Sequence, residues 1–140
     1  MATFTSKIYE SITLNGNDLG SYTTNTIEGI NYIDNRIMNC PSGSTTNLFT
    51  LSSTPGPGTF ITNNLKYARI TNNSTTPALL SIAYYNDTTS SILIPSGSSF
   101  FIPSSLTNIP GFNPTDNTIT TVSIQPSGSS ATIEYYIATT

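Results

Sequence analysis

Histidine and tryptophan are absent from this chain of 140 residues, and cysteine occurs once, as Cys40. Without histidine, the chain lacks the commonest general base, the usual metal ligand and any Ser-His-Asp triad. A single cysteine excludes an internal disulfide and a thiolate zinc site, so we expect Cys40 to be a small buried residue. A carboxylate pair for glycoside hydrolysis remains open, although the seven acidic residues are scattered. We therefore predict no enzyme, no cofactor, and no catalytic or metal-binding residue.

Charged residues are also scarce, since they make up 8% of the chain where an ordinary soluble domain has about 25%. Four cations without a cluster cannot supply the phosphate contacts of a nucleic-acid-binding protein, and anionic membranes are disfavoured for the same reason. No apolar run approaches the roughly 20 residues that span a membrane. Because interface cores are depleted in charge, this composition favours a chain that lies against other chains. A biased genome composition is the alternative, but it would also enrich lysine, and only Lys7 and Lys66 are present.

Asparagine, serine and threonine account for 60 of the 140 residues, yet 17 Ile, 9 Leu, 8 Tyr and 6 Phe suffice for a β core. Apolar and polar residues alternate most clearly near the end, where Ile133, Tyr135 and Ile137 share one face. We expect strands at residues 7–14, 19–24, 47–52, 65–71, 78–85, 90–94, 99–102, 118–124 and 131–138. Short strands separated by dense turn signals predict an all-β fold, an antiparallel β-sandwich that resembles a jelly roll.

The segment Ser-Thr-Pro-Gly-Pro-Gly at residues 53–58 is a loop that divides the chain. We interpret residues 1–140 as a single β domain. Within it, residues 1–52 form an N-terminal arm or hairpin region and residues 59–140 form the sandwich core. A long loop inside one sandwich is the alternative.

Two features of the N-terminal region bear on its structure. Asn15-Gly16 predicts a tight hairpin turn, because both residues tolerate positive φ. The same segment, through Asp18, resembles part of a calcium loop, but such a loop needs more carboxylates. The apolar series from Ile27 to Ile37 fits a bulged strand better than a short helical turn.

The tetrapeptide Pro-Ser-Gly-Ser occurs three times, at residues 41–44, 95–98 and 126–129. Proline presets φ for the second position of a type I turn, and glycine two residues later can take the left-handed conformation. The second and third copies separate alternating apolar segments, so we expect them to close bulged hairpins. A phosphate-binding role is weak, since no helix start or lysine follows.

Two tyrosine pairs and one arginine are the candidate contact residues. Neighbouring side chains of a strand point to opposite faces, so Tyr84-Tyr85 and Tyr135-Tyr136 should each have one buried and one exposed ring. An exposed tyrosine suits a protein interface, and filling of the core is the alternative for each. Arg69 either faces solvent, pairs with Glu134 across the sheet or anchors an interface.

Five short segments of the chain together form a recognisable sequence pattern. They are Phe4-Thr5-Ser6-Lys7-Ile8-Tyr9-Glu10, Ile37-Met38-Asn39-Cys40-Pro41-Ser42-Gly43, Lys66-Tyr67-Ala68-Arg69-Ile70-Thr71-Asn72, Ile94-Pro95-Ser96-Gly97-Ser98-Ser99-Phe100 and Ile133-Glu134-Tyr135-Tyr136-Ile137-Ala138. The pattern, mainly over residues 60–140, resembles small virion structural proteins of tailed phages of marine bacteria, including capsid decoration or cement proteins and head-fibre bases. The resemblance implies a β-sandwich or jelly roll bound to the major capsid protein, often as a trimer. It transfers no functional residue, because the motifs encode strands and turns.

The resemblance and the low charge together predict a non-enzymatic virion structural protein. We expect a capsid decoration or cement subunit on the capsid surface that stabilises the shell through contacts with the major capsid protein. We also expect a homo-oligomer, with a trimer favoured, and neither nucleic acid nor membrane as partner. The region before residues 53–58 could be an arm that adds a strand to a neighbour. The alternatives are a tail, neck or head-fibre subunit, or a lectin-like carbohydrate-binding β-sandwich in which tyrosines replace the missing tryptophan.

Overall fold

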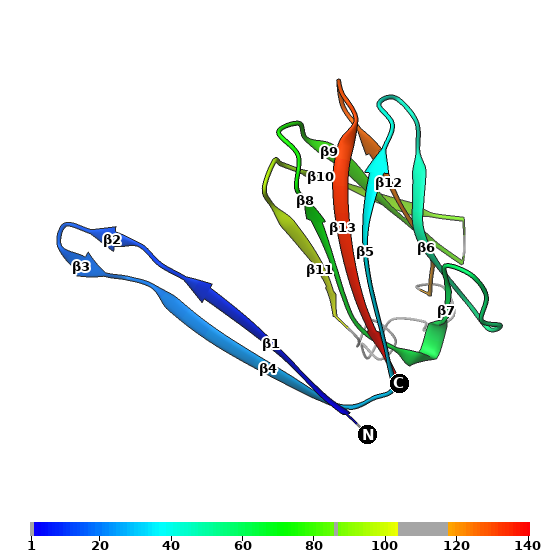
Figure 1. Cartoon of the computed structure of the whole chain (residues 1–140), viewed down its shortest axis with the longest axis horizontal. Helices are drawn as coiled ribbons and strands as arrows, with labels where there is room; N and C mark the ends of the chain where they lie inside the picture. Colours follow the sequence, from blue (N-terminus) through cyan, green and yellow to red (C-terminus); the bar gives the residue numbers. More distant parts are fainter. Residues whose placement is uncertain (1, 86, 104–117) are drawn as a thin grey trace.

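A computed structural model describes residues 2–85, 87–103 and 118–140, so Asp116 lies outside the described residues. Apart from one 3-10 helix, η1 (Thr62–Asn64), the regular elements of this part of the chain are strands (Figure 1). They are β1 (Ala2–Glu10), β2 (Thr13–Leu14), β3 (Asn17–Asp18), β4 (Ser21–Ile30), β5 (Tyr32–Cys40), β6 (Thr46–Ser52), β7 (Thr59–Ile61), β8 (Leu65–Asn72), β9 (Ala78–Tyr84), β10 (Thr89–Ile94), β11 (Ser99–Pro103), β12 (Ile119–Pro126) and β13 (Ala131–Thr139). The predicted all-β fold is confirmed.

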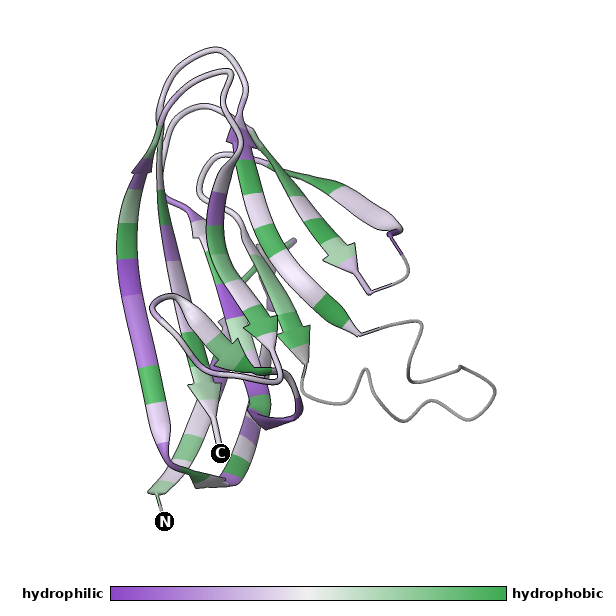
Figure 2. Cartoon of the chain, turned by 90° about the vertical axis from the view of Figure 1, so that its right-hand side faces the viewer, coloured by the Kyte–Doolittle hydropathy of each residue, from purple (hydrophilic) through white to green (hydrophobic). Residues whose placement is uncertain are grey.

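Two sheets pack face to face as a sandwich, as predicted. The four-stranded sheet has the order β11-β8-β13-β5, and the five-stranded sheet has the order β10-β9-β12-β6-β7. All neighbouring strands in these sheets are antiparallel except β6 and β7. Along the strands, apolar residues alternate with polar ones (Figure 2), because successive side chains point to opposite faces. The inward rows, with Phe49, Leu80, Ile124, Ile133 and Tyr135 fully buried, form the hydrophobic core.

None of the three Pro-Ser-Gly-Ser segments closes a hairpin, so the expectation for the second and third copies was wrong. They join β5 to β6, β10 to β11 and β12 to β13, and in each case the two strands belong to different sheets. Gly43, Gly97 and Gly128 do have the positive φ that the turn prediction requires. The local pattern indicates a reversal of the chain, but a reversal can return to the same sheet or cross to the other one. The crossings lie together at one end of the sandwich (Figure 1) and give the jelly-roll arrangement.

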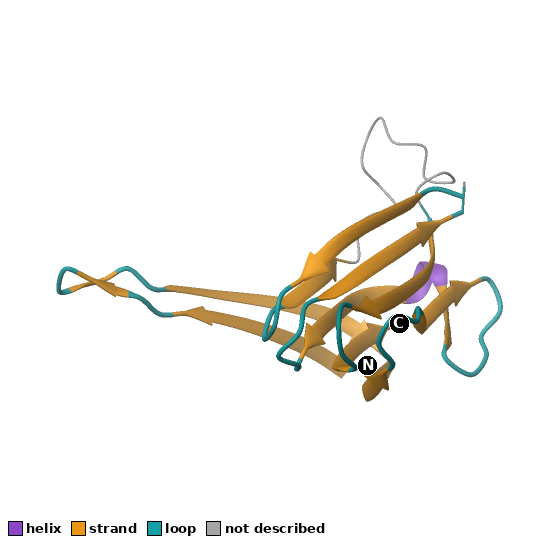
Figure 3. Ribbon diagram, turned by 90° about the horizontal axis from the view of Figure 1, so that it is seen from above, coloured by secondary structure: helices purple, strands orange, loops and turns teal. Residues whose placement is uncertain are grey.

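The first two long strands, β1 and β4, form a two-stranded antiparallel hairpin that projects from the sandwich (Figure 3). We call residues 2–30 the arm. At its tip β2 pairs with β3, and the loop between them is Asn15-Gly16, with φ of 52° and 80°. The predicted tight turn is therefore confirmed. At the base, β4 ends at Ile30 and β5 begins at Tyr32, so the apolar series from Ile27 to Ile37 forms two strands.

The boundary between arm and sandwich differs from the predicted one. β5 and β6 lie within the predicted N-terminal region, yet they pair with β13 and β12 of the sandwich. The boundary therefore falls at Asn31. The loop at residues 53–58 belongs to the sandwich, where it connects β6 to β7. Prolines and glycines indicate a loop, but they do not show whether the strands on its two sides belong to the same sheet. The boundary predicted from composition was therefore misplaced.

Candidate functional site

The base of the arm packs on the outer face of the four-stranded sheet. The ring of Phe4 in β1 lies 4.8 Å from the ring of Tyr67 in β8 and 5.6 Å from that of Tyr136 in β13, measured between centroids. Tyr136, the outward residue of its predicted pair, is half-buried under this contact. The aromatic cluster thus holds the root of the arm against its own sandwich.

Beyond this base the arm exposes large apolar side chains. Tyr9 and Tyr22 are direct partners across the hairpin, and their exposed fractions are 70% and 59%. The other exposed apolar residues of the outer arm are Ile8, Ile12, Leu14 and Leu19. In the part of the chain that the structure describes, β1 and β4 pair only with one another, so both outer edges of the hairpin are free to bond another strand. An isolated two-stranded hairpin is marginally stable at best in water.

Under the arm, Arg69 and Glu134 form an ion pair between β8 and β13, with Nη2 2.6 Å from Oε1. Of the three alternatives left open for Arg69, the structure shows the pairing with Glu134. Asn73 also donates to the other carboxylate oxygen of Glu134, at 3.4 Å. Arg69 lines a polar cleft of about 350 Å³ between β1 and the sheet, together with Lys7 and Asn35. The Arg69 guanidinium is thus paired with a carboxylate of its own chain, which favours a structural role over that of an interface anchor.

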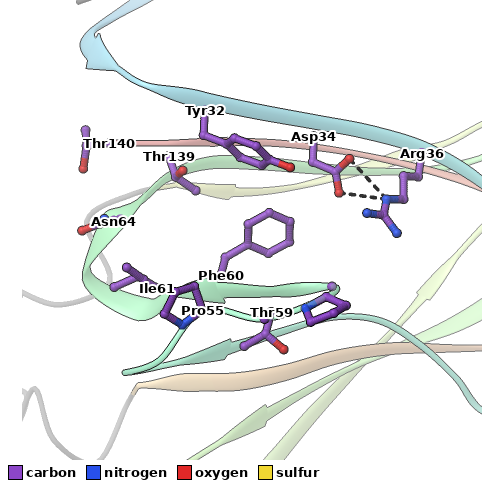
Figure 4. A pocket seen from close by; sticks show the side chains of 13 residues that line it. Tyr32, Asp34, Arg36, Pro55, Thr59, Phe60, Ile61, Asn64, Thr139 and Thr140 are labelled. Carbon is purple, nitrogen blue, oxygen red and sulfur yellow. Dashed lines mark hydrogen bonds and ion pairs between the residues drawn. The ribbon is translucent and has the colours of Figure 1, made fainter.

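A second cleft, of about 410 Å³, opens where the sandwich is bordered by the edge strands β5 and β7. Tyr32, Asp34 and Arg36 line it from the inward side of β5, and Phe60 and the loop 55–58 line it from the opposite sheet (Figure 4). The rings of Tyr32 and Phe60 are 6.1 Å apart and tilted by 47°. We call this the edge cleft. It combines aromatic surfaces with a charged pair in a chain that has few charges.

A hydrogen-bond network fixes the polar side of the edge cleft. Arg36 Nε donates to Asp34 Oδ1 at 3.2 Å and lies 3.0 Å from Oδ2 in the same ion pair, and the Tyr135 hydroxyl donates to Asp34 Oδ2 at 3.0 Å. The hydrogen bond to Asp34 raises the pKa of Arg36. Burial and then the hydrogen bond to Asp34 raise the pKa of Tyr135 to about 12. Sequence reasoning missed this site, although two opposite charges two positions apart in an otherwise uncharged strand were a usable signal.

The raised pKa of Tyr135 predicts a loss of stability at alkaline pH. Folding favours the neutral phenol, so its contribution is complete below the ordinary pKa of 10 and is lost as the pH rises through about 12. We expect the free energy of unfolding of the wild type to fall more steeply over this range than that of Tyr135→Phe, which lacks the titrating group. Urea denaturation of both proteins across this pH range measures the difference, and parallel curves would contradict the prediction.

The remaining predicted residues lie as follows. Cys40 is a buried free thiol at the end of β5, and burial raises its pKa, so the thiolate is disfavoured. Tyr135 is buried and Tyr85 is 71% exposed, while Tyr84 is partly buried against the core. The predicted division of Tyr135-Tyr136 between the inner and the outer face is confirmed, but Tyr136 is half-buried under the arm and not exposed as expected. Asn15–Asp18 forms the tip of the arm, where Asp18 Oδ1 accepts a hydrogen bond from the backbone of Gly20 at 2.9 Å.

Within the described ranges, no three acidic or cysteine side chains gather in a way that could hold a metal ion. Within the same ranges, no helix has the length and hydropathy of a membrane span.

Comparisons with known proteins give a weak structural similarity. No protein-family model matches the chain, and no curated protein matches it. A solved structure described as "Bacillus endospore appendages form a novel family of disulfide-linked pili" is similar to this chain with a TM-score of 0.45 and 14% sequence identity. The match covers 77% of this chain and 84% of that chain.

Proposed function

We propose that this protein is a non-enzymatic structural subunit of a larger protein assembly and that its arm binds a neighbouring subunit. The observation that carries the proposal is the projecting hairpin with exposed apolar side chains, which among the described residues contacts the sandwich only at its root. A soluble chain gains nothing from such an element alone, because the side chains remain in water and the strand edges remain unpaired. Contact with a neighbour would cover both.

The energetic argument for the arm is additive. Six large apolar residues of the arm are between 41% and 70% exposed, namely Ile8, Tyr9, Ile12, Leu14, Leu19 and Tyr22. Covering the exposed part of one such side chain is worth about 1 kcal/mol. The free edges of β1 and β4 add backbone hydrogen bonds if a strand of the partner lies beside them, and this mode of binding needs no charges. Lys7, Glu10, Asp18 and Glu28 are the only charged residues of the arm, so little charge must be desolvated.

For the assembly itself we propose the outer surface of a virus capsid. The protein would then be a decoration or cement subunit, present as a homo-oligomer and bound to the major capsid protein. This part of the proposal is supported by the sequence resemblance and by the low charge of the chain, and the arm supplies the element that reaches a neighbour. Each subunit would stabilise the shell by bridging adjacent capsid proteins.

Replacing the outer arm side chains tests the proposal. We expect the fourfold variant Tyr9→Ser, Leu14→Ser, Leu19→Ser and Tyr22→Ser to bind purified capsids at least about a hundredfold more weakly than the wild type, because about four apolar contacts are lost. Co-sedimentation with particles stripped of this protein measures binding, and mass spectrometry of native particles gives its copy number relative to the major capsid protein.

The matched control is one triple variant with Leu79→Ser, Tyr85→Ser and Leu93→Ser. It removes exposed apolar side chains of the sandwich and leaves the arm intact. It should bind like the wild type, and both variants should keep the wild-type β circular dichroism spectrum. Undiminished binding of the arm variant would overturn the role of the arm. Absence of the protein from purified particles would overturn the capsid assignment.

A further inference from the structure

The edge cleft has the composition of a binding site and is not explained by the arm. Three alternate residues of β5, Tyr32, Asp34 and Arg36, point inward and all line it. Inward-pointing charges on an edge strand are one device against unwanted strand pairing, which accounts for charge at this position. That device does not require an open cleft, nor aromatic rings on both walls. Tyr32 is 53% exposed and Phe60 lies opposite it, with Pro55 nearby (Figure 4).

Donors and acceptors remain available beside these rings. Among the described residues, Arg36 hydrogen-bonds Asp34 through Nε, and its terminal N–H groups make no hydrogen bond, so they can donate to a ligand. Asp34 accepts from Arg36 and Tyr135, and a carboxylate has about four acceptor sites. The side chain of Arg36 is 53% exposed and that of Asp34 is 12% exposed, so solvent reaches the pair from the cleft side. Because the two charges cancel, a neutral ligand suits the cleft better than an ion.

We propose that the edge cleft binds one neutral sugar residue. A pyranose ring has an apolar C–H face that packs on aromatic rings, and its hydroxyl groups both donate and accept hydrogen bonds. Tyr32 supplies the exposed aromatic surface and packs on the buried ring of Phe60, which is 8% exposed, while Arg36 donates to hydroxyl oxygens and Asp34 accepts from a hydroxyl group. The volume of about 410 Å³ lies at the small end of the range of about 300–1,000 Å³ for ligand sites, which suits a terminal sugar. This binding goes beyond the proposed role in a capsid, since it would let the bound subunit attach to a glycan.

Saturation-transfer NMR on the purified full-length protein tests the site, with glucose, galactose, mannose and N-acetylglucosamine as probes. We expect transfer to the ring protons of at least one of these sugars. Tyr32→Ala should weaken binding of that sugar about tenfold or more, because the exposed aromatic platform is lost. Arg36→Met keeps most of the side-chain volume and should weaken it similarly. Tyr85→Ala, which removes an exposed tyrosine outside the cleft, should bind like the wild type.

Three outcomes would overturn the proposal. They are no transfer to any of the four sugars, transfer that persists unchanged in both cleft variants, and preferential binding of the anionic sugar sialic acid over the neutral ones. Thermal unfolding of each variant confirms that it is folded, and Tyr32 is exposed enough for its replacement to leave the core intact. The serine variant of the arm should bind sugar like the wild type, so failure of this site and failure of the capsid proposal are distinguishable.

Discussion

Replacement of Phe49 by alanine is expected to lower the free energy of unfolding by about 3–5 kcal/mol. Phe49, in β6, is 1% exposed and lies between the two sheets. Its ring is 5.7 Å from that of Tyr135 and 6.2 Å from that of Phe60, so it connects the four-stranded sheet to the wall of the edge cleft. Its removal costs the transfer of the side chain and leaves a cavity that rigid neighbouring strands cannot close. Urea denaturation followed by circular dichroism measures the change.

Phe101→Ala is the matched control for this prediction. Phe101 lies in β11 and is partly exposed on the outer face of the sandwich, where its ring is 6.2 Å from that of Tyr67. It should cost about 1 kcal/mol, the order of a single aromatic pair. Equal effects of the two substitutions would show that the inter-sheet core does not dominate the stability of this fold.

Replacement of Asn72 by alanine is the second large effect that we expect, at about 3 kcal/mol. Asn72 ends β8 and is fully buried. Its Nδ2 group donates to the carbonyl oxygens of Thr76 and Ile94, at 2.8 and 3.2 Å, and its Oδ1 accepts from the backbone N–H of Ser74 at 3.0 Å. Alanine would leave these backbone groups without partners at the end of the sandwich where the chain crosses between sheets. Each buried group left unsatisfied costs about 1–3 kcal/mol.

Asn39→Ala is the control for Asn72, because Asn39 is an exposed asparagine within β5. It should change the free energy of unfolding by no more than about 0.5 kcal/mol. Chemical denaturation of the two variants side by side measures the difference. A small effect at Asn72 would mean that water replaces the lost hydrogen bonds and that the crossing loops are held by their backbone contacts alone.

Local patterns in this chain were sufficient to predict most of the strands. In residues 131–138 the alternation of Ile133, Tyr135 and Ile137 with polar residues identifies β13 and its buried face, because successive side chains of a strand point to opposite sides. Asn15-Gly16 likewise identifies the tip of the arm, since positive φ is a property of the residues at the turn itself. Both inferences depend only on neighbours in the sequence.

The sequence by itself therefore determined the all-β class, most of the strand positions, the buried thiol and the tight turn of the arm. The tertiary structure alone decided that the Pro-Ser-Gly-Ser loops cross between sheets, that the arm ends at Asn31 and that Tyr32, Asp34 and Arg36 meet Phe60 in one cleft. The physical reason is that strand pairing joins residues far apart in the chain. Whether a strand lies at an edge, and which wall it faces, depends on every other strand and not on the residues beside it.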